Sequence, residues 1–387
     1  MFQLNFSPLL YVCPWDLSYN ERLEMLGSGH CKVAFYYGNM HDSSTYRYRV
    51  YNMAQALNAA GNAISASFFH KGDLEKTSEI FNAADIIVIA RAQYCQRLGH
   101  AISVAINKNK KLIYDIDDLI FDTRYLQLIL NTIGIDYTQD NVWRYWYGDF
   151  SRHSHVLSLC DKVTTTNNYL ADIIRNHSGK EVAVIPNFLN REQLTISKGL
   201  FQCKKDGGYK TTDPVYLGYF SGSPTHNYDF QIITDAIIPL FEKYDNLRLR
   251  ITGLLDLDER LKVWSERIEF QPFQDFVTLQ KSIAEIDINL IPLQDNEFTN
   301  CKSELKYFEA GIVGTVSIAS PTYVYTNIIQ DGHNGFLANT YEWKAKIEQL
   351  IDNKADYSRI AENAFQYSNQ HYSCDNMSSL IEKAILS

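Results

Sequence analysis

The sequence lacks any run of about 18 apolar residues, so no membrane-spanning helix is expected among its 387 residues. No lysine- or arginine-led apolar segment opens the chain, so we expect no secretory signal. Its seven cysteines include no C-x-x-C pair. Scattered, odd-numbered cysteines predict reduced thiols in a cytoplasmic protein, and they argue against a disulfide framework or a zinc site.

The sequence also lacks an excess of positive charge. A net charge of −9 argues against a nucleic-acid binder as a whole, although it leaves room for a local anion pocket. No G-x-G-x-x-G motif occurs, so a dinucleotide-binding interpretation is weak. At 387 residues the chain is too long for one ordinary core, so two domains are expected. The 26 tyrosines suit a protein that handles sugars or other flat polar ligands.

The first half of the chain alternates strand and helix patterns. Residues 31–37 predict a buried strand, residues 46–57 a helix with Ser43 or Ser44 as its N-cap, and residues 64–69 the next strand. Such a βαβ unit implies a parallel sheet covered by helices on both faces. Ligands bind at the carboxyl ends of such strands, so the loop that begins with Gly38 is a candidate contact.

Three carboxylates follow a strand predicted at residues 111–114. Asp115, Asp117 and Asp118 stand where this architecture places chemistry, and like charges so close raise one another's pKa. They can serve as a general base, a holder of an acceptor hydroxyl or a metal ligand, or they can cap the next helix. A metal is less favoured, because no matching set of ligands accompanies them.

Aromatic residues dominate the partly helical stretch 122–150. Trp143, Trp146, Tyr147 and Phe150 recur at helical spacing, which favours a stripe facing the core. The alternatives are the wall of an acceptor cleft and contact with a membrane surface. Little positive charge lies nearby, which argues against the membrane.

Residues 188–213 break the pattern, since they hold several Gly and Lys residues and show no periodic hydrophobicity. We expect an exposed interdomain linker there. The second half then opens as the first does, with a strand at 215–220, a loop with Ser221, Gly222 and Ser223, and a helix at 228–244. That loop can present N–H groups and hydroxyls to a phosphate. His226 is either a phosphate or sugar ligand, or a solvated residue at a helix start.

The richest stretch, residues 300–320, predicts a loop, an amphipathic helix and a buried strand. Lys302, Lys306 and Glu309 fall on one face near the helix start, where partial positive charge favours anions. This pattern suits a nucleoside diphosphate, with the lysines on the phosphates and Glu309 on the ribose diol. The alternative is an ordinary solvated helix with a Lys/Glu ion pair.

The order of these parts resembles the GT-B glycosyltransferases of family 4, the group 1 enzymes of bacterial polysaccharide synthesis. In the second half the resemblance is carried by residues 218–226 (GYFSGSPTH), 287–293 (DINLIPL), 302–310 (KSELKYFEA) and 331–337 (DGHNGFL). In the first half it is carried by residues 46–49 (YRYR), 115–118 (DIDD) and 185–187 (IPN). It covers roughly residues 31–370 and implies an α/β fold of two Rossmann-like doubly wound domains that face each other across a cleft.

The resemblance implies a retaining, metal-independent glycosyltransferase of the hexosyltransferase type. It would move a sugar from a nucleotide-diphosphate sugar, its co-substrate, to a glycan or lipid-linked acceptor, with no cofactor and no nucleic acid. The implied catalytic residues are Asp115, Asp117, Lys306 and Glu309. The implied donor-binding residues are Gly38, Asn39, Ser221, Gly222, Ser223, His226, Gln271, Phe273, Lys302, Ser303, Lys306 and Glu309, and the implied acceptor-binding residues are Arg47 and Asp118.

The sequence departs from this family at two places. Cys301 stands where the family's E-x-x-x-x-x-x-x-E motif has its first glutamate, and a thiol cannot accept sugar hydroxyls as a carboxylate does. The family's Arg/Lys phosphate pair is also absent, with Ser223 and His226 near those positions. These departures keep open a non-catalytic partner of another transferase. A nucleotide-sugar epimerase on the same architecture is a further alternative.

The expected domains follow from these patterns. Residues 1–30 form an unassigned N-terminal arm, 31–187 the acceptor domain, 188–213 the linker and 214–368 the donor domain. Residues 369–387 form a helix that crosses back to the first domain. The protein is expected in the cytoplasm, with peripheral contact between the N-terminal domain and the inner membrane surface left open.

Overall fold

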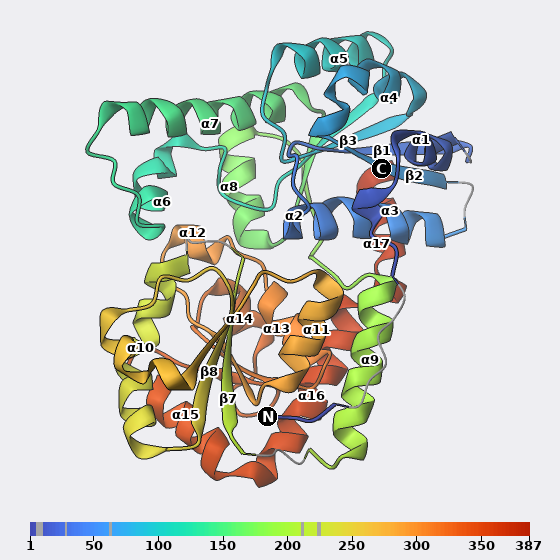
Figure 1. Ribbon diagram of the computed structural model, residues 1–387. Helices are drawn as coiled ribbons and strands as arrows, with labels where there is room; N and C mark the ends of the chain where they lie inside the picture. The colour runs from blue at the N-terminus through green and yellow to red at the C-terminus, as the bar shows by residue number, and fades with distance from the viewer. Residues whose placement is uncertain (5–10, 28, 62–63, 210–212, 223–225) are drawn as a thin grey trace.

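The structure is a computed structural model that describes residues 1–4, 11–27, 29–61, 64–209, 213–222 and 226–387. Two lobes lie one above the other, and each is built on its own parallel sheet (Figure 1). The first lobe holds the N-terminal half of the chain and the second most of the C-terminal half. The predicted fold class, two doubly wound α/β domains that face each other, is confirmed.

The first sheet has the strand order β2-β1-β3-β4-β5-β6, and all of its pairs are parallel. Its strands are β1 (Cys31–Tyr37), β2 (Ile64–His70), β3 (Ile86–Ala90), β4 (Lys111–Asp115), β5 (Lys162–Thr165) and β6 (Val182–Val184). Its helices are α1 (Tyr19–Gly27), α2 (Ser44–Tyr46), α3 (Asn52–Ala59), α4 (Thr77–Ala83), α5 (Gln96–Asn107), α6 (Leu126–Thr132), α7 (Asp140–Leu159) and α8 (Asn168–Ser178). The Ser43 hydroxyl accepts from the Tyr46 amide, so Ser43 is the N-cap of the helical run that follows β1.

The second sheet has the order β12-β11-β10-β7-β8-β9, again with parallel pairs. Its strands are β7 (Val215–Ser221), β8 (Leu247–Gly253), β9 (Ile268–Gln271), β10 (Ile288–Ile291), β11 (Val316–Ala319) and β12 (Phe336–Leu337). Its helices are α10 (Asn227–Lys243), α11 (Phe276–Glu285), α12 (Glu297–Asn300), α13 (Leu305–Gly311), α14 (Tyr323–Ile328), α15 (Trp343–Asp352) and α16 (Lys354–Tyr372).

Continuous apolar runs explain why these strands are central. Every residue of β3, IIVIA, and of β10, INLI, is buried, as expected for strands covered by helices on both faces. The strand order reverses at β1 in the first sheet and at β7 in the second, because each has neighbours that continue in opposite directions. The carboxyl ends at such reversals form a crevice in which ligands bind.

Most of the segment 188–213, predicted as an exposed interdomain linker without periodic hydrophobicity, is helical, and its place as the link between two domains stays a prediction. Residues 191–206 form a regular helix, α9 (Arg191–Asp206), which runs along one side of the second lobe (Figure 1). The buried face of α9 mixes apolar residues with polar ones that find partners. Ser197 donates to Gln280 at 2.9 Å and Lys204 to Thr315 at 2.6 Å. Polar residues on the inner face hid the helical period.

The N-terminal arm contacts both lobes and not only the first. Phe2 is buried in the core of the second lobe, and its amide donates to the Glu285 carbonyl at 2.9 Å. Further on, α1 packs against β2, where Ser67 donates to the Arg22 carbonyl at 2.5 Å. The arm therefore passes from one lobe to the other.

The C-terminal end of the chain also passes from the second lobe to the first. After α16 the chain continues as α17 (Ser378–Leu386), which lies against α3 of the first lobe, where Ser378 donates to the Ala56 carbonyl at 3.1 Å (Figure 1). Among the residues that the structure describes, none of the helices combines the length and apolar character that crossing a membrane requires.

Candidate active site

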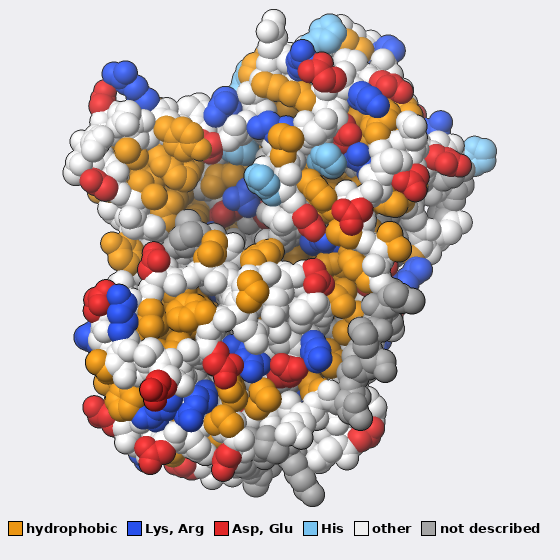
Figure 2. Space-filling model, viewed as in Figure 1, with side chains coloured by type: hydrophobic (Ala, Val, Ile, Leu, Met, Phe, Trp, Pro, Cys, Tyr) orange, Lys and Arg blue, Asp and Glu red, His pale blue; other side chains and the backbone are white. Residues whose placement is uncertain are grey.

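A cavity of about 740 Å³ lies between the lobes. It sits at the carboxyl ends of β1, β3 and β4 in the first lobe and of β7 and β10 in the second. Figure 2 shows the hollow between the lobes and, beside it, hydrophobic side chains gathered over α6 and α7. The sheets alone dictate this position, since both strand-order reversals open toward it.

Basic side chains outnumber acidic ones on the wall. Lys71, Arg91, Arg152, Lys302 and Lys306 line it, against Asp117, Asp118 and Asp149. The protein as a whole is acidic, so this is a local concentration of positive charge that favours an anionic ligand. Polar and aromatic residues from both lobes complete the wall, among them Gly38, Asn39, Ser43, Thr45, Gln93, Tyr145, Trp146, His153, Asn187, Gly222, His226 and Ser303.

Lys306 is the most unusual of the cations. Its Nζ is buried and has no hydrogen-bond partner among the described residues. It lies 5.0 Å from the centre of the Tyr219 ring. Burial lowers its pKa from 10.5 to about 8, although Asp229 and Glu309 oppose the effect. A buried ammonium without a partner is costly, so this group is placed for an anion that enters the cavity.

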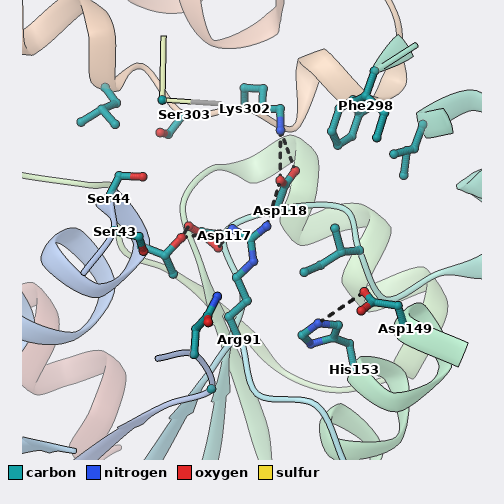
Figure 3. A pocket seen from close by; sticks show the side chains of 18 of the residues that line it. Ser43, Ser44, Arg91, Asp117, Asp118, Asp149, His153, Phe298, Lys302 and Ser303 are labelled. Carbon is teal, nitrogen blue, oxygen red and sulfur yellow. Dashed lines mark hydrogen bonds and ion pairs between the residues drawn. The ribbon is translucent and has the colours of Figure 1, made fainter. Parts of the chain in front are cut away.

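Lys302 crosses the cavity to the other lobe. Its Nζ contacts both oxygens of Asp118 at 3.0 Å, and Arg91 approaches Asp118 from below at 3.4 Å (Figure 3). Burial of Asp118 opposes its ionisation, but Lys302 and Arg91 outweigh this and hold its pKa below the ordinary value. Asp118 of the first lobe and Lys302 of the second thus form an ion pair across the cavity.

Asp117 lies beside this pair on the first lobe. It accepts from the Thr45 hydroxyl at 2.8 Å and from Arg91 at 3.2 Å. Arg91 itself follows β3 with a φ of 46°, an uncommon conformation for a large side chain. Arg91 therefore fixes both carboxylates at the floor of the cavity.

The second lobe adds polar groups around the lysines. His226 Nδ1 lies 3.0 Å from Asp229, and burial, together with Lys306, lowers the pKa of His226. Ser303 accepts from the Asn187 side chain of the first lobe at 3.0 Å. Gly222 lines the cavity close to the end of β7, as the sequence predicted for a loop that faces a ligand. The predicted contact Ser223 lies outside the described residues.

Several predicted site residues do not reach the cavity wall. Asp115 is buried, where it pairs with Arg49 at 2.7 Å and accepts from Thr164 at 2.7 Å. Arg47, predicted to bind the acceptor, pairs with Asp42 and lies 4.3 Å from the centre of the Phe276 ring in the second lobe. Neither side chain lines the cavity, so their predicted roles stay predictions that require these ion pairs to open.

Glu309 also lies behind the wall. It accepts from the Tyr48 hydroxyl of the first lobe at 2.5 Å, and burial raises its pKa to about 7. Its predicted role on the ribose diol stays a prediction that requires it to leave Tyr48. Cys301 is buried as well, and its thiol donates to the Glu297 carbonyl at 3.1 Å, so it presents nothing to a ligand.

Three further donor-site predictions fall away from the wall. Ser221 is buried at the end of β7, and Gln271 accepts from the Gln274 amide at 3.1 Å. Phe273 is largely exposed. None of the three lines the cavity. By contrast, Gly38, Asn39, Gly222, His226, Lys302, Ser303, Lys306, Asp117 and Asp118 do line it.

Sequence reasoning missed a group of residues on the first lobe. Arg91 directly follows β3, a strand that the sequence predicts. The principle that ligands bind at the carboxyl ends of parallel strands, which points to Asp115, therefore also points to Arg91. Gln93, Asp149, Arg152 and His153 line the same wall from the loop after β3 and from α7. The sequence gives little sign of a site at these residues, because single polar residues on an aromatic helix look like the solvent-exposed side of that helix.

The aromatic stretch has two roles. Phe150 is fully buried, and Trp143 packs on the core of the first lobe, as the favoured interpretation predicted. Trp146 packs on that core and also lines the cavity together with the exposed Tyr145. Part of this helix therefore lines the cavity, while Tyr147, predicted on the core-facing stripe, is exposed. Whether this wall binds an acceptor stays a prediction.

The described residues contain no cluster of three or more His, Cys, Asp or Glu side chains arranged to hold a metal ion. The cavity can instead bind an anion through Lys302 and Lys306 and bind hydroxyls through Asp117, Thr45 and Ser43. That combination of a fixed positive charge and nearby carboxylates suits a phosphorylated, hydroxyl-rich ligand.

Comparisons with known proteins agree with this fold. Residues 215–353 match the sequence model of the family described as Glycosyl transferases group 1. This segment contains Lys302, Lys306 and Glu309, so the resemblance to group 1 GT-B glycosyltransferases is confirmed over the second lobe. No curated protein sequence matches the chain significantly.

Solved structures show the same two-lobed GT-B fold. The HepE protein of Anabaena in complex with UDP and glucose superposes with a TM-score of 0.62 at 14% identity, over 92% of this chain and 99% of that chain. Sucrose-phosphate synthase of Thermosynechococcus elongatus gives 0.61 at 13%, over 91% and 97%. WaaG, a glycosyltransferase involved in lipopolysaccharide biosynthesis, gives 0.59 at 14%, over 91% and 98%.

Proposed function

We propose that this protein is a retaining glycosyltransferase that moves a sugar, a hexose, from a UDP-sugar to an acceptor hydroxyl in glycan synthesis. The observation that carries the proposal is the buried, unpartnered ammonium of Lys306 on the wall of the interlobe cavity. The match of residues 215–353 to group 1 glycosyltransferases supports it. Support for the uridine base comes from the structural relative that was solved with UDP and glucose.

Lys306 and Lys302 are proposed to bind the diphosphate. Negative charge builds on the departing diphosphate oxygen as its bond to the anomeric carbon breaks, so fixed positive charge beside it lowers the barrier. Lys306 is free to do this as it stands. Lys302 must exchange Asp118 for phosphate, which frees Asp118 for the acceptor. The two ammonium groups would supply this charge without a divalent cation.

The first lobe is proposed to hold the sugar and the acceptor. Asp117 is kept in place by Thr45 and Arg91, so its carboxylate can orient a hydroxyl without moving. Asn39 and Gly38 lie at the end of β1, opposite the lysines. The acceptor would be a glycan or a lipid-linked sugar, and the enzyme would act in the cytoplasm or at the inner membrane surface.

A nucleotide screen with matched variants tests the proposal. Thermal unfolding is measured with UDP, GDP, TDP, CDP and ADP for the wild type, Lys306→Met and Lys344→Met, the last an exposed lysine on α15 away from the cavity. At a hundredfold excess over the dissociation constant, a ligand adds about 2.7 kcal/mol to the free energy of unfolding. We expect UDP to raise the melting temperature of the wild type and of Lys344→Met but not of Lys306→Met.

The screen also separates the competing functions. If no nucleotide shifts the melting temperature, the non-catalytic partner suggested by Cys301 is favoured and the proposal fails. If UDP binds, analysis of the products from a UDP-sugar follows. A transferred sugar of unchanged anomeric configuration supports a retaining transferase, whereas an isomerised UDP-sugar would identify an epimerase.

A further inference from the structure

One face of α7 forms the wall of the cavity that lies in the first lobe, away from Lys306. Tyr145, Trp146, Asp149, Arg152 and His153 all line the cavity. They recur at intervals of three and four residues, so they share one side of the helix. Aromatic and charged side chains therefore lie together on one side of α7.

This wall is held in place from behind. The buried His153 Nδ1 lies 2.8 Å from the Tyr114 hydroxyl, and burial lowers the pKa of His153 to about 3, so the ring is neutral. The Tyr94 amide donates to the Arg152 carbonyl at 3.1 Å, which ties the loop after β3 to α7. Figure 3 shows Asp149 and His153 side by side. A site supported in this way is formed before a ligand arrives.

The side chains are those that recognise a sugar. Gln93 donates to Asp149, and both line the cavity, so their remaining donors and acceptors can meet sugar hydroxyls. Trp146 is half-buried and lines the cavity on the same side of α7 as Asp149. Such rings supply apolar contact area next to polar groups, as the two surfaces of a pyranose require.

Two cations mark one edge of this wall. Lys71 and Arg152 line both the main cavity and an adjoining pocket of about 60 Å³, together with Gln93 and Gly38. Among the described residues, neither side chain has a carboxylate within ion-pair distance, and Arg152 donates only to the Gly148 carbonyl at 3.2 Å. Arg91, the third Lys or Arg that the first lobe contributes to the wall, differs because it is paired with Asp117 and Asp118.

We propose that this wall is the acceptor subsite and that it takes an anionic sugar, whose phosphate or carboxylate lies between Lys71 and Arg152. The inference rests on the proposed function, because it assigns the acceptor of the same cavity. It is a second anion site, since Lys302 and Lys306 stand on the opposite lobe. Trp146 and the Gln93–Asp149 pair bind the sugar ring, and the two cations select its charge.

The test compares charged and neutral sugars with UDP present in excess, so that the donor lysines are already occupied. Binding of methyl glucuronide, glucose 6-phosphate and methyl glucoside is measured by saturation-transfer NMR titration. The variants are Lys71→Gln/Arg152→Gln and a control, Lys108→Gln/Arg144→Gln, whose residues do not line the cavity. Arg144 lies on α7 itself and is mostly exposed, which matches the control to Arg152.

We expect at least one charged sugar to bind the wild type and the control about tenfold more tightly than methyl glucoside, as a charge-assisted contact provides. The preference should vanish in Lys71→Gln/Arg152→Gln while binding of methyl glucoside persists. A preference for glucose 6-phosphate alone would identify the anionic group of the acceptor as a phosphate. A preference for methyl glucuronide alone would identify it as a carboxylate.

Equal binding of charged and neutral sugars by the wild type would overturn the inference, as would a preference that survives in Lys71→Gln/Arg152→Gln. Its failure is distinguishable from that of the proposed function. If the wild type does not bind UDP, the proposed transferase function fails. The same titrations without UDP would still show whether this wall prefers charged sugars to neutral ones.

Discussion

Replacement of Lys306 by methionine should have two effects: it should stabilise the folded protein and abolish nucleotide binding. The lowering of the Lys306 pKa from 10.5 to about 8 corresponds to about 3 kcal/mol, which folding spends on keeping the ammonium charged without a partner. Methionine is similar in length and carries no charge, so it fills the same space beside Tyr219 without that cost. The free energy of unfolding at pH 7 should rise by up to about 3 kcal/mol.

The pH dependence gives this prediction a signature. A lysine whose pKa is lowered on folding destabilises the protein below pH 8, and the loss disappears as the pH rises from about 8 to 10.5. The gain from Lys306→Met should therefore be complete at pH 7 and fade above pH 8. Urea unfolding at several pH values measures it, with Lys344→Met as control. A destabilised Lys306→Met, or a gain that does not vary with pH, would show that the Lys306 ammonium does not destabilise the folded protein.

Three further predictions follow from the same contacts. The affinity for UDP should fall about tenfold between pH 7 and pH 9 as free Lys306 loses its proton. Calorimetry should show the same fall in Lys344→Met, and an affinity that does not change over this range would contradict the role of Lys306. Asp118→Asn removes the carboxylate that pairs with Lys302, so UDP should bind severalfold more tightly. Weaker binding than in the wild type would contradict the proposal that Lys302 exchanges Asp118 for phosphate. Arg49→Met leaves the buried Asp115 without its ion-pair partner, so the free energy of unfolding in urea should fall by about 3–5 kcal/mol while the affinity for UDP is unchanged. Loss of UDP binding in a variant of full stability would instead indicate that Asp115 belongs to the binding site.

The strands and the motif helix could be read from the sequence because each obeys a local rule. The run CKVAFYY predicts a strand at residues 31–37, and β1 is Cys31–Tyr37. The stretch around residue 305 predicts a helix that ends near Gly311, and α13 is Leu305–Gly311. Buried parallel strands and short amphipathic helices reveal themselves through neighbouring residues alone.

Other features depend on partners far away in the chain. Asp115 and Asp117 are alike in the sequence, but Arg49, 66 residues earlier, pairs with Asp115 and leaves Asp117 to the cavity. The helix α9 was missed because Gln193, Ser197 and Lys204 lie on its buried face, where a hydrophobic pattern is expected. Tyr48 takes Glu309 away from the cavity in the same way, across the two lobes.

Titration calorimetry with UDP shows whether the interlobe cavity is a nucleotide site that depends on Lys306. We expect one UDP per chain for the wild type and for Lys344→Met, and no measurable heat of binding for Lys306→Met. Binding of UDP to Lys306→Met with unchanged affinity would exclude Lys306 from the site, and a wild type that binds no UDP would exclude a nucleotide site in this cavity.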